Sequence, residues 1–161
     1  AGGGADIPPG ACLDFAVRTA SLARMELIAF LISAVTLLLG TALGFKGWFD
    51  PAWAAALVRL QPRPDQPEGI AEFRGTFGGM FAGLHLVALI LLLIGDSETG
   101  AAVCWVLAAG WWGTAAARAW SMAVDPPARH PFQRFSTGLE VVVGLLIAAN
   151  PIAQLLGAGG L

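Results

Sequence analysis

The sequence predicts an all-α, polytopic membrane protein, with four transmembrane helices in a bundle and a short interfacial helix after the first span. Of its 161 residues, 57% are hydrophobic and only 12% are charged, whereas roughly 25% are charged in a soluble domain. The mean hydropathy is +0.71, which favours the bilayer as solvent. The formal net charge of -2 is too small for a disordered chain or for a protein that binds nucleic acid.

Four apolar stretches are long enough to cross a bilayer, since a helix needs about 20 mostly apolar residues to span a hydrocarbon core roughly 30 Å thick. They lie near residues 25–45, 75–95, 100–122 and 137–157. Together they form one transmembrane domain over residues 25–157, between an N-terminal tail at 1–24 and a C-terminal tail at 158–161. No extramembrane domain fits into the remainder.

The first span carries Glu26 as its only charge, at its very edge. The connection after it opens with Asp50-Pro51, a helix-start signal with proline at the first helical position. The apolar, tryptophan-bearing segment 52–60 therefore predicts a short helix in the interface. Residues 61–69 contain three prolines and mixed charges, which predict a loop that returns to the second span.

The other spans differ in the polar residues that they contain. The second has no charge, the third carries Arg118 near its end, and the fourth carries Glu140 near its start. Asn150-Pro151 predicts a kink in the fourth span, with neighbouring groups satisfying the freed carbonyl. The connections at 46–74 and 123–136 hold most of the basic residues, which favours a cytoplasmic location for them under the positive-inside rule.

Small residues form stripes along the spans. Gly75, Gly79 and Gly83 repeat at a spacing of four, which in lipid lets a neighbouring helix approach closely. The first and third spans have similar stripes (Gly40 and Gly44; Ala109, Gly113 and Ala117). We therefore predict helix packing at these positions. The alternative is space for a flat ligand or a lipid against the backbone.

Four charged residues gather at one membrane face: Arg74 opens the second span, Arg118 closes the third, Glu140 opens the fourth, and Glu72 lies just outside. A charge in or near hydrocarbon needs a partner. The short connection predicts an ion pair between Arg118 and Glu140, and Arg74 is a second candidate for the same carboxylate. Two interpretations stay open. In the first, the charges have a structural role: they lock helices together, or their side chains snorkel to the headgroups. In the second, they form a polar pocket for a headgroup, a quinone or a substrate.

His85 lies ten residues beyond Gly75, hence about 15 Å along the helix and near the middle of the membrane. It is a candidate ligand for haem or for a chlorophyll magnesium, and also a candidate proton relay. The alternative is a neutral histidine hydrogen-bonded to another helix. His130 lies in a connection, and Cys12 and Cys104 are isolated, so that no paired-histidine haem site, redox pair or zinc site is expected. We predict no metal and no cofactor, although a bound lipid or quinone is compatible with the pattern.

The residues at the entrance to the second span carry a resemblance to a known family. The pattern comprises Glu72, Arg74, Gly75, Gly78 and Gly79, with Arg118 and Glu140 in the later spans. It resembles the small bacterial membrane family catalogued as domain of unknown function 4345, over about residues 25–157. That resemblance implies a four-helix membrane architecture and importance for these charges, but no reaction. The long N-terminal tail and the acidic link at 96–99 depart from the usual member.

No nucleophile elbow, phosphate loop or paired-histidine metal motif is present in the sequence, and the protein is not expected to be an enzyme. The first hypothesis is a non-enzymatic accessory or assembly subunit of a larger respiratory or photosynthetic complex in the bacterial inner (cytoplasmic) membrane. Its expected partners are the bilayer and other membrane subunits. The alternative is a carrier or binder of a small molecule, a lipid or a proton that uses the Arg/Glu cluster.

Overall fold

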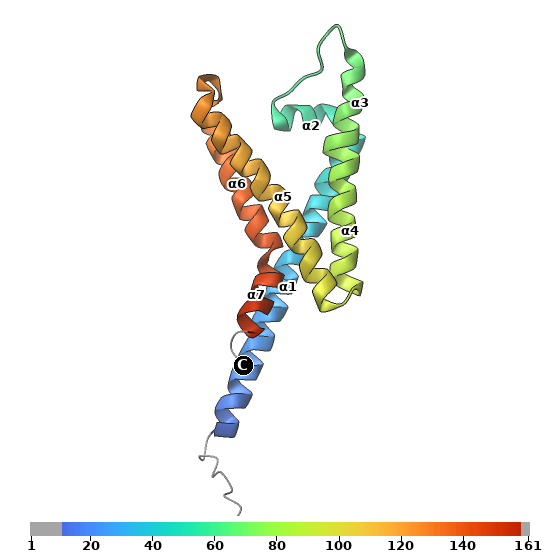
Figure 1. The fold of residues 1–161 in the computed structure, drawn as a ribbon. Helices are drawn as coiled ribbons and strands as arrows, with labels where there is room; N and C mark the ends of the chain where they lie inside the picture. The colour runs from blue at the N-terminus through green and yellow to red at the C-terminus, as the bar shows by residue number, and fades with distance from the viewer. Residues whose placement is uncertain (1–10, 159–161) are drawn as a thin grey trace, which may run out of the picture.

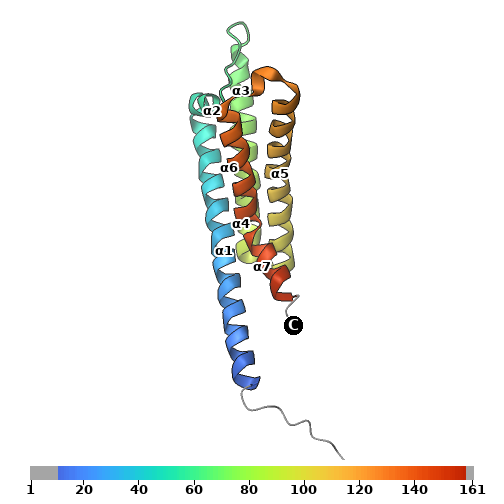
Figure 2. The same cartoon turned by 90° about the vertical axis from the view of Figure 1, so that its left-hand side faces the viewer.

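The structure, a computed structural model, describes residues 11–158, with side chains from residue 17 to residue 157. Its regular elements are α1 (Ala11–Phe49), α2 (Pro51–Val58), η1 (Pro67–Gly69), α3 (Ile70–Glu72), η2 (Phe73–Met80), α4 (Phe81–Ile94), α5 (Ser97–Val124), η3 (Pro126–Ala128), α6 (Pro131–Ile147) and α7 (Ala149–Ala158) (Figure 1). All are helical, as predicted. Figure 2 shows α1, α4, α5 and α6 running alongside one another.

Three continuous helical segments are long and apolar enough to cross a membrane: Val17–Phe49, Pro67–Ile94 and Ser97–Val124. A fourth crossing consists of two helices, Pro131–Ile147 and Ala149–Gly157, which meet at an angle of 48°. The chain is therefore a multi-pass membrane protein whose fourth span is broken near the predicted kink.

The first helix is longer than the predicted span. It has 39 residues, which at 1.5 Å per residue extend over about 58 Å, well beyond a hydrocarbon core of roughly 30 Å. Its first residue, Ala11, lies inside the expected tail at 1–24. The reason is that residues 11–24 contain neither glycine nor proline, so nothing stops the helix where the apolar run begins.

The break in the fourth span is held by a serine of the first. Pro151 has no N–H to donate to the carbonyl of Ile147, four residues earlier. The Ser33 hydroxyl lies 2.9 Å from that carbonyl oxygen and accepts a 3.0 Å hydrogen bond from the backbone N–H of Asn150. Ser33 is completely buried. The structure thus confirms both the kink and the expectation that neighbours satisfy the freed carbonyl.

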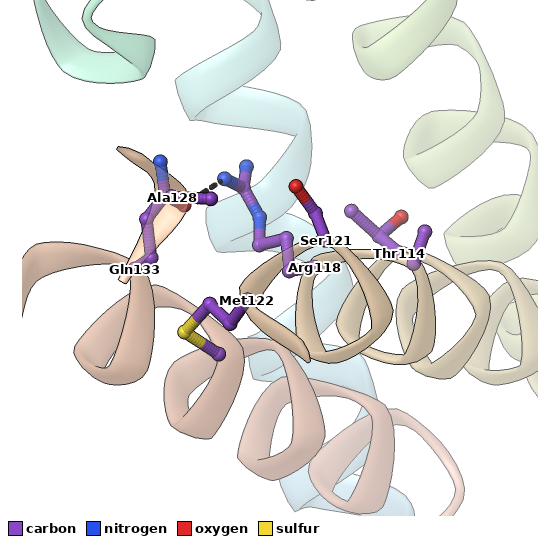
Figure 3. Close-up of a pocket in the computed structure, with 7 residues that line it drawn as sticks. Thr114, Arg118, Ser121, Met122, Ala128 and Gln133 are labelled. Carbon is purple, nitrogen blue, oxygen red and sulfur yellow. Dashed lines mark hydrogen bonds between the residues drawn. The ribbon is translucent and has the colours of Figure 1, made fainter. Parts of the chain in front are cut away.

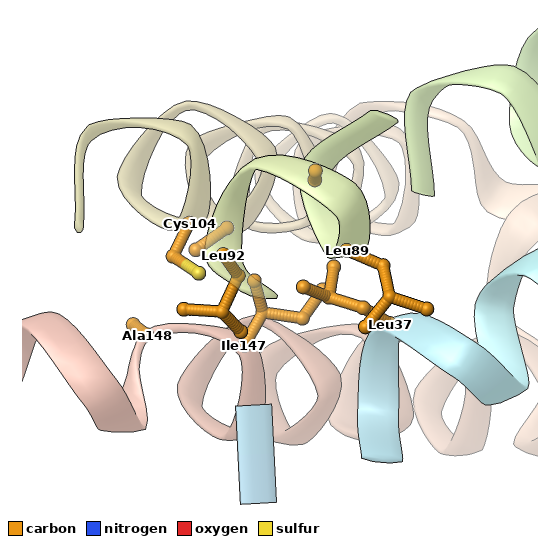
Figure 4. Close-up of a cluster of buried hydrophobic side chains, with 8 residues drawn as sticks. Leu37, Leu89, Leu92, Cys104, Ile147 and Ala148 are labelled. Atoms are coloured by element: carbon orange, nitrogen blue, oxygen red, sulfur yellow. The ribbon is translucent and has the colours of Figure 1, made fainter. Parts of the chain in front are cut away.

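Small residues fill the interior, and large apolar residues lie outside. Nine of the fifteen buried apolar residues among those described are alanines, which lets the helices approach closely. Eight buried residues form the central cluster, where the α4–α5 and α6–α7 segments meet α1: Leu37, Ala88, Leu89, Leu92, Cys104, Ala108, Ile147 and Ala148 (Figure 4). The exterior is rich in exposed leucine, isoleucine and valine, as expected for a surface that contacts lipid.

The predicted short helix after the first span is α2, which lies across the end of α1 (Figure 1). The Asp50 side chain caps it by accepting a 3.1 Å hydrogen bond from the backbone N–H of Trp53, and Pro51 is its first residue. Lys46 donates a 2.7 Å hydrogen bond to the same carboxylate. This bond, followed by that from Trp53, holds the pKa of Asp50 below its ordinary value.

Candidate functional site

The α5–α6 hairpin joins two of the predicted charges. Arg118 Nε donates a 2.7 Å hydrogen bond to Glu140 Oε1, and Arg118 Nη1 donates another 2.7 Å bond to Gln133 Oε1. The predicted Arg118–Glu140 pair is therefore confirmed. The Glu140 side chain is 8% exposed and that of Arg118 is 30% exposed, so the pair is poorly screened by solvent. The second oxygen of Glu140, Oε2, is buried without a hydrogen-bond partner among the described residues.

A pocket of about 290 Å³ lies beside this pair. It is lined by Thr114, Ala117, Arg118, Ser121, Met122, Ala128 and Gln133 (Figure 3). The hydroxyls of Thr114 and Ser121 already donate to the Gly110 carbonyl and to Asp125. The Arg118 guanidinium is thus the strongest donor in the wall. Chemically, the pocket suits an oxygen acceptor on a mainly apolar molecule.

The other two predicted members of the cluster lie elsewhere, so the expectation that Arg74 shares the Glu140 carboxylate is wrong. Arg74 Nη1 donates a 2.8 Å hydrogen bond to the carbonyl of Trp48, which is in the last turn of α1 and lacks a partner within that helix. Glu72 is exposed and has no ion pair among the described residues. The alternating topology fixed the membrane face but not the lateral position: at this face α5 and α6 diverge from η2 (Figure 1).

An unpredicted contact links α2 to the start of α6. The guanidinium carbon of Arg59 lies 3.8 Å from the centroid of the Phe132 ring, a cation–π arrangement. Arg59 follows α2 in a left-handed backbone conformation with φ 58°. The loop after α2 is therefore tied to the hairpin that carries Arg118 and Glu140.

His85 is buried where three helices meet. Its Nδ1 lies 2.8 Å from the carbonyl oxygen of Phe81, and its Nε2 accepts a 3.3 Å hydrogen bond from the indole N–H of Trp111 on α5. Gly40 of α1 makes room for the ring, because a Cβ at residue 40 would collide with the imidazole. Both ring nitrogens are used, which fits the neutral, hydrogen-bonded histidine. An axial bond to haem or to a chlorophyll magnesium would have to displace Trp111.

No helix among the described residues packs against the glycine stripe of the second span, so helix packing at these positions stays a prediction. A Cβ at Gly75 or Gly83 would meet nothing within 4 Å, and one at Gly79 would meet only the Arg74 carbonyl oxygen at 3.6 Å. We call these three positions the outer glycine face. The π-helical turns of η2 and the α4 helix present a different set of residues to α1.

The face that packs against α1 is Gly78, Ala82 and His85. A Cβ at Gly78 would lie 2.6 Å from the Trp48 Cα, and one at Gly44 would collide with the Ala82 backbone. The predicted close approach at Gly40 and Gly44 is thus confirmed, whereas Gly113 of the third stripe has open space around it. The prediction for the second span counted only glycines four apart, and it missed the neighbouring face that completes the fit around His85.

The remaining predicted residues belong to the core or lie outside the described part. Cys104 is a free, buried cysteine of the central cluster, and the Cys12 side chain lies outside the described residues. Between residues 17 and 157 no three His, Cys, Asp or Glu side chains gather as a metal site would require.

Two further site residues, Gln133 and Trp111, were missed by sequence reasoning. Gln133 precedes Glu140 by seven residues, about two helical turns, so the two share a helix face, and a search for polar partners at that spacing would have found Gln133. Trp111 carries no such signal, because its partner His85 lies on another helix.

The sequence that carries this geometry matches the model of a known protein family. The family model described as a domain of unknown function, DUF4345, matches residues 25–149, which include the hairpin pair and the outer glycine face. No curated protein matches, and no solved structure matches.

Proposed function

The chain belongs to the DUF4345 family, and we propose that it is a non-enzymatic accessory or assembly subunit of a larger complex, respiratory or photosynthetic, in the bacterial inner membrane. The proposal rests on the outer glycine face (Gly75, Gly79 and Gly83), which no helix in the described part of the chain covers. Bare backbone along about two helical turns permits close contact with another transmembrane helix, for which dispersion and packing supply the driving force.

The surroundings of the outer glycine face support a protein partner over lipid alone. Met80 is 56% exposed and Leu84 is 54% exposed beside the glycines, so the low backbone surface adjoins large apolar side chains. A partner helix can interdigitate with such a surface, as ridges pack into grooves.

The test is gentle solubilisation of the native membrane followed by native electrophoresis. We expect the wild-type protein to migrate with a large complex and Gly83→Leu to migrate as a small species, because the new side chain fills the contact surface. Gly138→Leu on α6 is the matched control, since residue 138 also has open space around it but lies on another helix. The wild-type protein migrating only as a small species would contradict the proposal.

A second candidate function is the binding or transport of a small molecule or lipid at the Arg118 pocket. Two observations favour it: the pocket of about 290 Å³ beside Arg118, and the buried Glu140 Oε2 that lacks a partner. An unsatisfied polar atom in a native protein calls for an explanation such as a water, an ion or a ligand. A bound hydroxyl or a water would satisfy it here.

Binding of a short-chain ubiquinone and of phosphatidylglycerol to the purified protein tests this second function. If the pocket binds either probe, Ala117→Leu should abolish binding, because residue 117 lines the pocket, and should leave the thermal unfolding temperature unchanged. Ala116→Leu, one position away and exposed on α5, is the control. Equal binding by both variants would contradict a binding site in this pocket, and the Arg118–Glu140 pair would then be a structural contact between α5 and α6.

A further inference from the structure

A second, larger groove lies at the opposite end of the bundle from the Arg118 pocket. Its volume is about 670 Å³, within the range of ligand sites. The walls come from the outer part of α1, the first turn of α5 and the C-terminal helix α7. The lining residues are Thr19, Leu22, Ala23, Glu26, Leu27, Phe30, Ser97, Asn150, Gln154 and Gly157. The groove therefore joins an apolar wall to a polar one.

The polar wall contains two side-chain amides. Asn150 is 5% exposed as a residue and its backbone N–H donates to the Ser33 hydroxyl. Glu140 Oε2 is the one buried side-chain polar atom without a partner among the described residues, so the Asn150 amide is not closed off by the fold. Because Asn150 lines the groove, its amide is open to a ligand there, and Gln154, one turn further along α7, offers a second amide.

The groove also carries one negative charge. Among the described residues, Glu26 is the only ionisable one in the lining, and its carboxylate lies against α7: a Cβ at Gly157 would be 2.8 Å from Glu26 Oε1. No described residue forms an ion pair with Glu26. Arg18 and Arg24 are on the same part of α1 but do not line the groove. The site therefore suits a hydrogen-bond donor that carries positive charge.

The position of the groove points to a lipid. Ser97 is the first residue of α5, directly after the turn at Gly95 and Asp96 that ends the apolar helix α4. This turn marks a boundary between hydrocarbon and headgroups. Glu26 lies at the edge of the apolar run of α1, and Leu27 and Phe30, further along α1 toward the centre of the bundle, supply an apolar wall for acyl chains.

We propose that this groove binds phosphatidylethanolamine. The primary ammonium of the headgroup donates to Glu26, and the amides of Asn150 and Gln154, with the Ser97 hydroxyl, donate to the phosphate and ester oxygens. Phosphatidylcholine has no N–H to donate, and phosphatidylglycerol has no positive charge. The geometry therefore favours the ethanolamine headgroup over both, and this inference is independent of the subunit role proposed above.

The experiment is native mass spectrometry of the full chain, released from nanodiscs that contain equal amounts of phosphatidylethanolamine, phosphatidylcholine and phosphatidylglycerol. We expect the wild-type protein to retain phosphatidylethanolamine preferentially. Glu26→Gln should lower its retention relative to phosphatidylglycerol about tenfold, the scale of one charge-assisted hydrogen bond. Glu98→Gln, which removes an acidic residue of the same turn region outside the groove, should change nothing.

A second variant tests the groove without changing its charge. Gly157→Leu places a side chain where Glu26 and the ligand would lie, and it should abolish the selective retention while the circular dichroism spectrum stays that of the wild type. The proposal is overturned if the wild-type protein retains the three lipids equally. It is also overturned if Glu26→Gln and Glu98→Gln give the same lipid ratios.

Discussion

Removal of the Ser33 hydroxyl is expected to loosen the contact between the first span and the broken fourth span. In Ser33→Ala, the Ile147 carbonyl and the Asn150 N–H both lose their partner in the completely buried junction. Interhelical hydrogen bonds in membrane proteins contribute about 0.6 kcal/mol on average and up to about 1.7 kcal/mol. Two such bonds in a fully buried site predict a loss of about 2 kcal/mol in the free energy of unfolding.

The matched control is Thr36→Val, three residues further along α1. The Thr36 hydroxyl donates only to the Ile32 carbonyl of its own helix, so its removal breaks no contact between helices and should cost less than about 0.5 kcal/mol. The assay is reversible unfolding in mixed micelles of a mild detergent and sodium dodecyl sulfate, followed by circular dichroism. If Ser33→Ala and Thr36→Val unfold at the same detergent fraction, the reasoning about the helix break is refuted.

Three other changes probe the packing, the ion pair and the interfacial helix. Gly40→Ala should lower the free energy of unfolding by about 1–3 kcal/mol, because its methyl group collides with the His85 ring; the same unfolding assay measures this. Glu140→Ala should cost about 3–5 kcal/mol, because it leaves Arg118 without its partner in a poorly solvated place, and a loss below about 1 kcal/mol would argue against a buried pair. The pKa of Asp50 is lowered in the folded protein, so its contribution to stability is present above the ordinary value of 3.8 and is lost as the pH falls below it. Amide chemical shifts of α2 should therefore show fraying only below pH 3.8, and fraying centred at or above pH 3.8 would contradict the capping role.

The elements that depend on local composition could be predicted from the sequence. Apolar length gave the spans, and the Asp50-Pro51 dipeptide gave the start of α2. The Arg118–Glu140 pair followed from charge scarcity and a short connection. In the first two cases the determining residues are close together in the chain. In the third, charged residues in the membrane are so few that each has only one reasonable partner.

The features that depend on lateral arrangement could not be predicted. Arg74 and Glu140 occupy the same membrane face, yet Arg74 instead caps the carbonyl of Trp48. The choice between two small-residue faces of the second span is settled by the fit of His85 against Gly40, which involves two distant segments. Ser33 carries no local signal for its role, because its partners lie more than 100 residues away in sequence.

The broken fourth span has a consequence for how the protein is made. A helix that enters lipid with an unsatisfied carbonyl and N–H has to bear their desolvation, which costs several kcal/mol per group. The Ser33 hydroxyl satisfies both Ile147 and Asn150. Ser33 is synthesised before these two residues and is therefore already in the membrane when the fourth span inserts. The fourth span thus needs the earlier first span as the surface on which it docks, and a variant that lacks α1 would leave the Ile147 carbonyl and the Asn150 N–H without these hydrogen bonds in the bilayer.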